Sequence, residues 1–159
     1  MDKIKLLLVD DEEEFVKALS QRIKMRQINS DVALNGEKAL EMVENEVPDV
    51  IVLDIRMPGI DGLEVLRRVK RDYDDVQVII LTGHGTDKEM EEAKRLGAYD
   101  VYKKPVDIDT LIDGIRKAYR KAERTMTAIT FAEAGERDTA LEYLKEEGRG
   151  GKKTDKKKT

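Results

Sequence analysis

Short apolar runs alternate with longer charged segments along the chain as far as about residue 122. The apolar runs are rich in Val, Ile and Leu and occupy residues 4–9, 32–34, 50–53, 76–81 and 99–102. Runs of this length and composition are typical of strands buried on both faces of a sheet. Between them, apolar residues recur at helical spacing, as in Leu111, Ile115 and Ala118. This alternation predicts an α/β fold, a doubly wound parallel sheet with helices on both faces.

The absence of cysteine and the distribution of charge exclude or disfavour several classes of function. The 159 residues include no cysteine, which excludes disulfides and thiolate metal sites. The net charge is −4, but residues 148–159 carry six Lys or Arg against one Asp, so the rest of the chain carries −9. Such an acidic body makes DNA binding unexpected. No apolar stretch approaches the roughly 18 residues of a membrane span, so we expect no membrane partner and a cytoplasmic location.

Chemically capable side chains follow four of the five predicted strands. Asp10 and Asp11 follow the first strand, Asp54 the third and Thr82 the fourth, and Lys104 lies just beyond the fifth. The carboxyl ends of parallel strands share one edge of a sheet, and ligands bind in the crevice beyond it. We therefore expect these side chains to form one site. Taken singly, each has an ordinary alternative, and Asp11 can equally be the N-cap of the helix that follows.

This combination of groups suits magnesium-dependent phosphoryl transfer. Clustered carboxylates stay ionised together only beside a cation. Mg²⁺ prefers oxygen ligands and binds through one or two carboxylates plus phosphate oxygens. A carboxylate beside it can act as a nucleophile toward phosphorus and form an aspartyl phosphate. An ammonium and a hydroxyl can then neutralise and hydrogen-bond the transferred group.

Four ordered motifs resemble the receiver domain of bacterial two-component response regulators. They are LVDDE at residues 8–12, LDIRMPGIDG at 53–62, LTGHG at 81–85 and Lys-Pro at 104–105, and LGAYD at 96–100 is also similar to that family. The resemblance covers roughly residues 3–122. It implies a flavodoxin-like fold, with a five-stranded parallel sheet in the order 2-1-3-4-5 and five helices.

The resemblance also implies a role for each residue that matches a motif. Asp54 would accept a phosphoryl group from a histidine kinase or a phosphotransfer protein. Asp11, Asp54 and the backbone carbonyl of Arg56 would bind Mg²⁺, and Asp10 would assist through water. Lys104 would pair with the phosphoryl group, and its bond to the following proline would be cis.

The remaining implied roles concern switching and its rate. Thr82 would be the hydroxyl that moves to meet the phosphoryl group. Arg56 and His84 would tune dephosphorylation, although we favour His84 as a partly exposed loop residue. Family members usually place Tyr or Phe where this chain has Val101. The aromatic switch is then absent, or it is replaced by Tyr99 or Tyr102, and we favour Tyr102 as a surface strand residue.

The segment beyond the predicted receiver, residues 123–159, is too short for a second globular domain. The helix that starts near Asp107 is expected to overrun the usual end. We predict a receiver over residues 1–122, a helical hairpin extension over 123–147 with a turn at Gly135, and a disordered basic tail over 148–159. The hairpin either folds back on the receiver or forms a homodimer or partner contact.

Signalling to a separate downstream protein is the function we favour. The alternative is a magnesium-dependent phosphotransferase or phosphatase with an aspartyl-phosphate intermediate. Such enzymes need a second acid two residues after the nucleophile, and that position holds Arg56. A flavin or nucleotide binder is disfavoured because acidic residues, not a Gly-rich loop, follow the first strand. The chain is thus expected to be a phosphoacceptor and not an enzyme.

Overall fold

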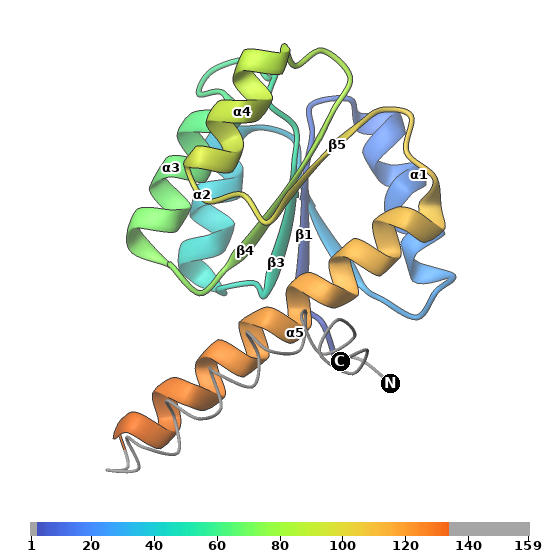
Figure 1. The fold of residues 1–159 in the computed structure, drawn as a ribbon. Coiled ribbons are helices and arrows are strands. Elements are labelled where there is room, and N and C mark those ends of the chain that lie inside the picture. The colour runs from blue at the N-terminus through green and yellow to red at the C-terminus, as the bar shows by residue number, and fades with distance from the viewer. Residues whose placement is uncertain (1–2, 134–159) are drawn as a thin grey trace, which may run out of the picture. The chain divides into compact units, whose positions relative to one another are not determined.

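The computed structural model describes residues 3–133 (Figure 1). Strands and helices alternate along the chain, as the apolar pattern predicts. The elements are β1 (Leu6–Val9), α1 (Glu13–Lys24), β2 (Ser30–Ala33), α2 (Gly36–Asn45), β3 (Val50–Leu53), α3 (Gly62–Asp72), β4 (Gln77–Thr82), α4 (Asp87–Arg95), β5 (Asp100–Lys103) and α5 (Ile108–Glu133).

The five strands form one parallel sheet in the order β2-β1-β3-β4-β5, which confirms the predicted topology. The central strand β1 pairs with β2 and β3, and its last residue, Val9, lies opposite Ala33 and Leu53. Leu53 in turn lies opposite Ile80 of β4. The strands therefore leave the sheet side by side at its carboxyl edge, and this register decides which side chains can meet there.

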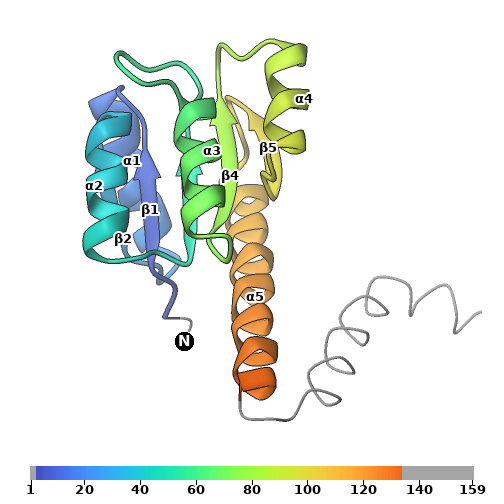
Figure 2. The ribbon, with the colours of Figure 1, turned by 90° about the vertical axis from the view of Figure 1, so that its left-hand side faces the viewer.

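Helices cover both faces of the sheet (Figures 1 and 2). Side chains alternate along each strand, so that Leu7 and Val9 pack with α2, α3 and α4 while Leu6 and Leu8 pack with α1 and α5. Both faces are buried, which is why the central strands are continuously apolar. Burial of each such aliphatic side chain stabilises the folded state by roughly 1.5–3 kcal/mol.

The edge strand β2 differs from its prediction. The apolar run begins at Val32, but the strand begins at Ser30, which pairs with Leu6. Ser30 is half-buried and Asp31 is exposed, because β2 has a neighbour on one side only. An apolar run therefore predicts the extent of a central strand well, but it predicts too short a strand at the edge of the sheet.

Side-chain caps fix where four of the helices begin. The side chains of Asn35, Asp61 and Thr86 accept backbone N–H groups at the starts of α2, α3 and α4, and Asp107 accepts the Thr110 N–H at the start of α5. Helix α1 has Glu12 at its N-cap and no side-chain cap. The alternative that Asp11 is a helix cap is therefore wrong, and Asp11 is exposed.

Helix α5 runs past the predicted receiver boundary, as expected, and ends at Glu133. The chain divides into two compact units, Met1–Tyr119 and Arg120–Thr159, and the domain boundary at residue 122 stays a prediction. The predicted turn at Gly135, the second arm of the hairpin and the basic tail lie outside the described residues. None of the helices within residues 3–133 is both long and apolar enough to cross a membrane.

The loop after β3 depends on a close backbone approach at Gly62, so Gly62→Ala is expected to destabilise the fold. The Gly62 N–H donates to the Ile55 carbonyl at 2.8 Å, and a β-carbon on Gly62 would overlap the Asp54 carbonyl oxygen. Backbone cannot swing aside as a side chain can, so we expect a loss of about 1–3 kcal/mol in urea unfolding.

The matched control is Gly83→Ala. A β-carbon on Gly83 would meet only the aliphatic chain of Lys104, at 3.6 and 3.7 Å, which is ordinary contact. We expect its unfolding free energy to stay within about 0.5 kcal/mol of the wild type. Equal urea midpoints for the two variants would contradict the close-approach argument.

Candidate functional site

The carboxyl edge of the sheet brings four predicted site residues together. The Asp10 N–H donates to the Ala33 carbonyl at 3.1 Å, and the Asp54 N–H donates to the Val9 carbonyl at 3.0 Å. The Lys104 N–H donates to the Thr82 carbonyl at 2.8 Å. These bonds extend the strand ladders by one residue, so the sheet itself fixes the backbone of the site.

The Lys104 ammonium is surrounded by carboxylates. Its Nζ lies 2.6 Å from Asp10 Oδ2, 3.0 Å from Glu12 Oε1 and 3.7 Å from Asp54 Oδ2. It also sits 4.1 Å from the centre of the Phe15 ring, within cation–π range. The Lys104 side chain is only 12% exposed, so these contacts are weakly screened by water. The site thus holds one fixed cation among three acids.

Burial and ion pairing act in opposite directions at Asp10 and Lys104. Burial raises the pKa of Asp10, although hydrogen bonds from Lys104 and from the Glu12 N–H favour its ionised form. Burial also works against the charged form of Lys104, but hydrogen bonds to Asp10 and Glu12 outweigh it and raise the pKa of Lys104. The ammonium therefore stays charged at neutral pH, while ionised Asp10 is held at a cost.

The acidic cluster fits a divalent metal ion. Asp10, Glu12 and Asp54 each present an oxygen within 4.8 Å of the others. Asp54 Oδ1 is buried, and within residues 3–133 it has no hydrogen-bond partner. A buried acceptor normally has a partner, so this oxygen marks an open ligand position. Three carboxylates against one ammonium leave an excess negative charge of the kind that Mg²⁺ neutralises.

One predicted metal ligand, Asp11, lies outside the acidic cluster that the structure forms. The side chain of Asp11 is exposed and is not among the three converging carboxylates. The third carboxylate of the cluster is instead Glu12, because Asp10 Oδ1 accepts the Glu12 N–H at 2.9 Å and Glu12 Oε1 accepts a hydrogen bond from Lys104 at 3.0 Å. The sequence reasoning missed Glu12, although it lies in the same acidic run. The Arg56 side chain pairs with Glu89 at 2.7 Å, which the sequence reasoning also missed.

The predicted switch residues Thr82 and His84 lie in one loop with different exposure. Thr82 is buried, and its Oγ1 accepts the His84 N–H at 3.4 Å. A β-carbon on Gly85 would meet Thr82 Cγ2 at 2.8 Å, so the loop folds closely over the threonine. The side chain of His84 is exposed. The peptide bond between Lys104 and Pro105 is cis, as the resemblance implies.

The two candidate positions for an aromatic switch face opposite sides of the sheet. Val101 packs with the α2–α4 cluster, and Tyr102 packs with the α1–α5 cluster. Tyr102 is half-buried, so the interpretation as a surface residue is wrong. A β-carbon on Gly114 would lie 2.5 Å from its hydroxyl, so α5 has room for Tyr102 only because Gly114 lacks a side chain. Burial, with Asp100 nearby, raises the pKa of Tyr102 to about 12.

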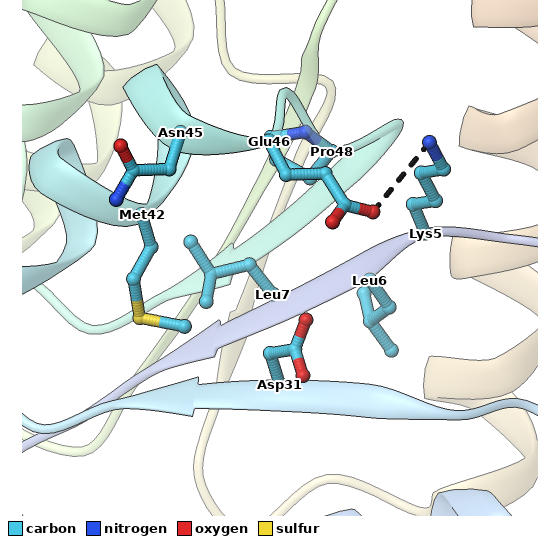
Figure 3. A pocket seen from close by; sticks show the side chains of 8 residues that line it. All are labelled: Lys5, Leu6, Leu7, Asp31, Met42, Asn45, Glu46 and Pro48. Carbon is cyan, nitrogen blue, oxygen red and sulfur yellow. Dashed lines mark ion pairs between the residues drawn. The ribbon is translucent and has the colours of Figure 1, made fainter.

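A second hollow lies at the opposite end of β1 and does not resemble a reactive site (Figure 3). It has a volume of about 240 Å³, and its lining includes Leu7, Met42 and Asp31. Its only cation, Lys5, pairs with Glu46 at 3.5 Å, and both side chains are well exposed. The chemistry of the described residues therefore concentrates at the carboxyl edge.

The family is decided by a match over residues 6–116 to the model described as the response regulator receiver domain. The chain belongs to the response regulator receiver family. Receiver domains are phosphoacceptors of two-component signalling and bind Mg²⁺ at an acidic pocket. In this receiver, the cluster of Asp10, Glu12 and Asp54 forms an acidic pocket of this kind.

The relatives of this receiver include both short and long proteins. Sporulation initiation phosphotransferase F of Bacillus subtilis is 37% identical over 113 residues, 71% of this chain and 91% of that protein. The C4-dicarboxylate transport transcriptional regulatory protein DctD of Pseudomonas aeruginosa is 39% identical, but the match spans only 24% of it. Among solved structures, the Francisella response regulator 1452 receiver domain matches with a TM-score of 0.70 and 28% identity, over 75% of this chain and 98% of that one.

Because burial raises the pKa of Asp10, Asp10→Asn is expected to stabilise the metal-free receiver. A folded-state pKa above the ordinary 3.8 means that ionised Asp10 costs stability, and this cost appears as the pH rises from 3.8 through the folded pKa. Asn is neutral at every pH and nearly isosteric, and Lys104 keeps Glu12 and Asp54 as partners. We expect a higher urea midpoint for the variant at pH 7 in EDTA.

Two further conditions check this expectation. The advantage of Asp10→Asn should shrink as the pH falls through the folded pKa and vanish well below 3.8, where the wild-type carboxyl is protonated in both states. Added Mg²⁺ should stabilise the wild type more than the variant, because a ligand stabilises the state that binds it. A variant that is equally or less stable at pH 7 in EDTA would contradict the argument.

Proposed function

We propose that Asp54 is the residue that accepts the phosphoryl group. It leaves β3 at the carboxyl edge and is 4% exposed, and its Oδ1 has no partner among residues 3–133. Its Oδ2 lies 3.7 Å from the Lys104 ammonium. A carboxylate with one oxygen free and one near a fixed cation can attack phosphorus while its charge is stabilised. That free oxygen is the observation that carries the assignment.

The donor in this proposal is a phosphohistidine on a histidine kinase or a phosphotransfer protein. An Asp54 oxygen forms a bond to phosphorus as the bond between phosphorus and the imidazole nitrogen breaks. The electron pair of the broken bond stays on the imidazole, and the product is an acyl phosphate. Lys104 lies beside the oxygens that gain charge, and the rigid strand ends hold both groups in place.

Magnesium in this proposal is held by Asp54, Asp11 and the backbone carbonyl of Arg56, with Asp10 assisting. When bound, the ion supplies positive charge that offsets the crowded oxygens of the carboxylate and the phosphoryl group. Glu12 keeps a separate role as a partner of Lys104. The side chain of Asp11 is exposed, so it is accessible to a metal ion.

Switching follows from the charge that the phosphoryl group adds, nearly two units with three acceptor oxygens. Thr82 is buried, and the one hydrogen bond of its hydroxyl among the described residues is the long bond from the His84 N–H. Moving toward the phosphoryl group lets it trade this weak bond for a charge-assisted one. The loop to α4 follows, and the changed surface is read by a separate downstream protein. Residues 123–147 are proposed as a partner or homodimer contact.

A turnover enzyme is the weaker proposal. Hydrolysis of an aspartyl phosphate at useful rates needs an acid or base beside the nucleophile. The position two residues after Asp54 holds Arg56, whose side chain is a guanidinium and not a carboxylic acid. We therefore propose acceptance of the phosphoryl group followed by slow loss.

The acceptor assignment is tested by intact mass after incubation with Mg²⁺ and acetyl phosphate. We expect one added phosphoryl group on the wild type and none on Asp54→Asn. The matched control is Asp61→Asn, because Asp61 is a nearby carboxylate that caps α3 and Asn keeps that cap. The control should be phosphorylated like the wild type. An adduct on Asp54→Asn would overturn the assignment.

The metal ligands are separated by comparing Asp11→Asn with Glu12→Gln in calorimetric titrations with Mg²⁺. Loss of a direct carboxylate ligand should weaken binding about tenfold or more. Glu12→Gln removes only a partner of Lys104 and should change the affinity by less than about threefold. The reverse order of the two variants would assign Glu12 as the ligand in place of Asp11.

A further inference from the structure

One carboxylate oxygen joins the loop that carries Asp54 to the start of α4. Glu89 Oε1 accepts Arg56 Nη2 at 2.7 Å, and it also accepts the Thr86 N–H at 3.0 Å and the Thr86 hydroxyl at 3.2 Å. Glu89 completes a capping box in which its own N–H donates to Thr86 Oγ1. The capping box therefore holds the Glu89 carboxylate in place, and the carboxylate in turn holds the Arg56 guanidinium.

Charge keeps this pair in place at neutral pH. The hydrogen bond from the Thr86 N–H and the nearby Arg56 guanidinium lower the pKa of Glu89, so it is ionised. The Glu89 side chain is 24% exposed and that of Arg56 is 53% exposed. An ion pair this exposed contributes little free energy, so only a small free-energy difference keeps Arg56 beside Glu89.

The arginine has room to move. Arg56 and Glu89 line a cavity of about 480 Å³ between the Asp54 loop and α4, together with Ile55, Met57 and Asp61. The carboxylate of Asp61 accepts the Glu64 N–H at 2.9 Å as the cap of α3, so it is already engaged. If Glu89 is neutralised, the strongest new anion near Arg56 is the phosphoryl group two residues away. A guanidinium binds phosphoryl oxygens with two parallel hydrogen bonds.

We propose that Glu89 is a positioning residue that holds Arg56 away from the phosphoryl group on Asp54 and thereby shortens the life of that group. The proposal rests on Asp54 being the acceptor. In the decay reaction a water oxygen bonds to phosphorus, the bond from phosphorus to the Asp54 oxygen breaks, and inorganic phosphate and the carboxylate result. An arginine laid across the phosphoryl oxygens stabilises the acyl phosphate and covers the approach of water.

The test is the decay of the phosphorylated receiver, followed by intact mass after acetyl phosphate is removed by desalting. Glu89→Gln keeps an oxygen that can accept the Thr86 N–H but loses the charge that holds Arg56. We expect its phosphoryl group to last about two to five times longer than that of the wild type, the factor that an exposed ion pair supports. In the Arg56→Ala background, Glu89→Gln should change nothing.

Thr86→Ala is the matched control, because it removes the side-chain cap of α4 but keeps both the Glu89 charge and the backbone N–H that holds its carboxylate. Its phosphoryl lifetime should stay at the wild-type value while its urea midpoint falls. An unchanged or shorter lifetime in Glu89→Gln would overturn the proposal, and so would a longer lifetime that persists without Arg56. Absence of any adduct on the wild type is a different result, because it would overturn the assignment of Asp54 itself.

Discussion

The ammonium of Lys104 is the interaction on which the carboxyl edge of this receiver depends. Three carboxylates converge there, and two of them, Asp10 and Asp54, are almost fully buried. Without a cation such a group would be driven to protonate or to separate. The hydrogen bond from Lys104 favours the ionised form of Asp10, yet one ammonium cannot balance three carboxylates, and this imbalance leaves the site ready for a metal ion. The site also lowers the stability of the fold, because burial disfavours the ionised form of Asp10.

The fold explains how residues more than 90 positions apart meet. Parallel pairing in the order β2-β1-β3-β4-β5 puts the ends of the central strands level, and one further ladder bond from each strand places Asp10, Asp54 and Lys104. Loops then add the parts that can move. Thr82 ends β4 under a tightly folded loop, and the capped start of α4 lies just beyond it. Rigid strand ends thus carry the phosphoryl chemistry, and the capped helix beside them can report on it.

Much of this could be predicted from the sequence. Apolar runs of strand length, helical spacing between them and acids after the first and third runs were enough for the fold class and the edge that holds the site. These signals are local, and the geometry of a parallel sheet then determines which side chains face each helical layer. What failed depends on tertiary contacts. The polar edge strand β2 begins at Ser30, before its apolar run, and Tyr102 is half-buried because Gly114 leaves space for it. Glu12 lies in the acidic run after β1 and Glu89 completes a capping box with Thr86, but local sequence does not show that they pair with Lys104 and Arg56.

The central claim is that Asp54 is where this edge receives its phosphoryl group, and the most direct measurement locates that group chemically. Borohydride reduces an acyl phosphate to an alcohol, so a phosphorylated aspartate becomes homoserine and can be found by tandem mass spectrometry. We expect homoserine at Asp54 alone, and only after phosphorylation in the presence of Mg²⁺. Homoserine at Asp10 or Asp11, or a phosphoryl group that borohydride leaves in place, would contradict the account.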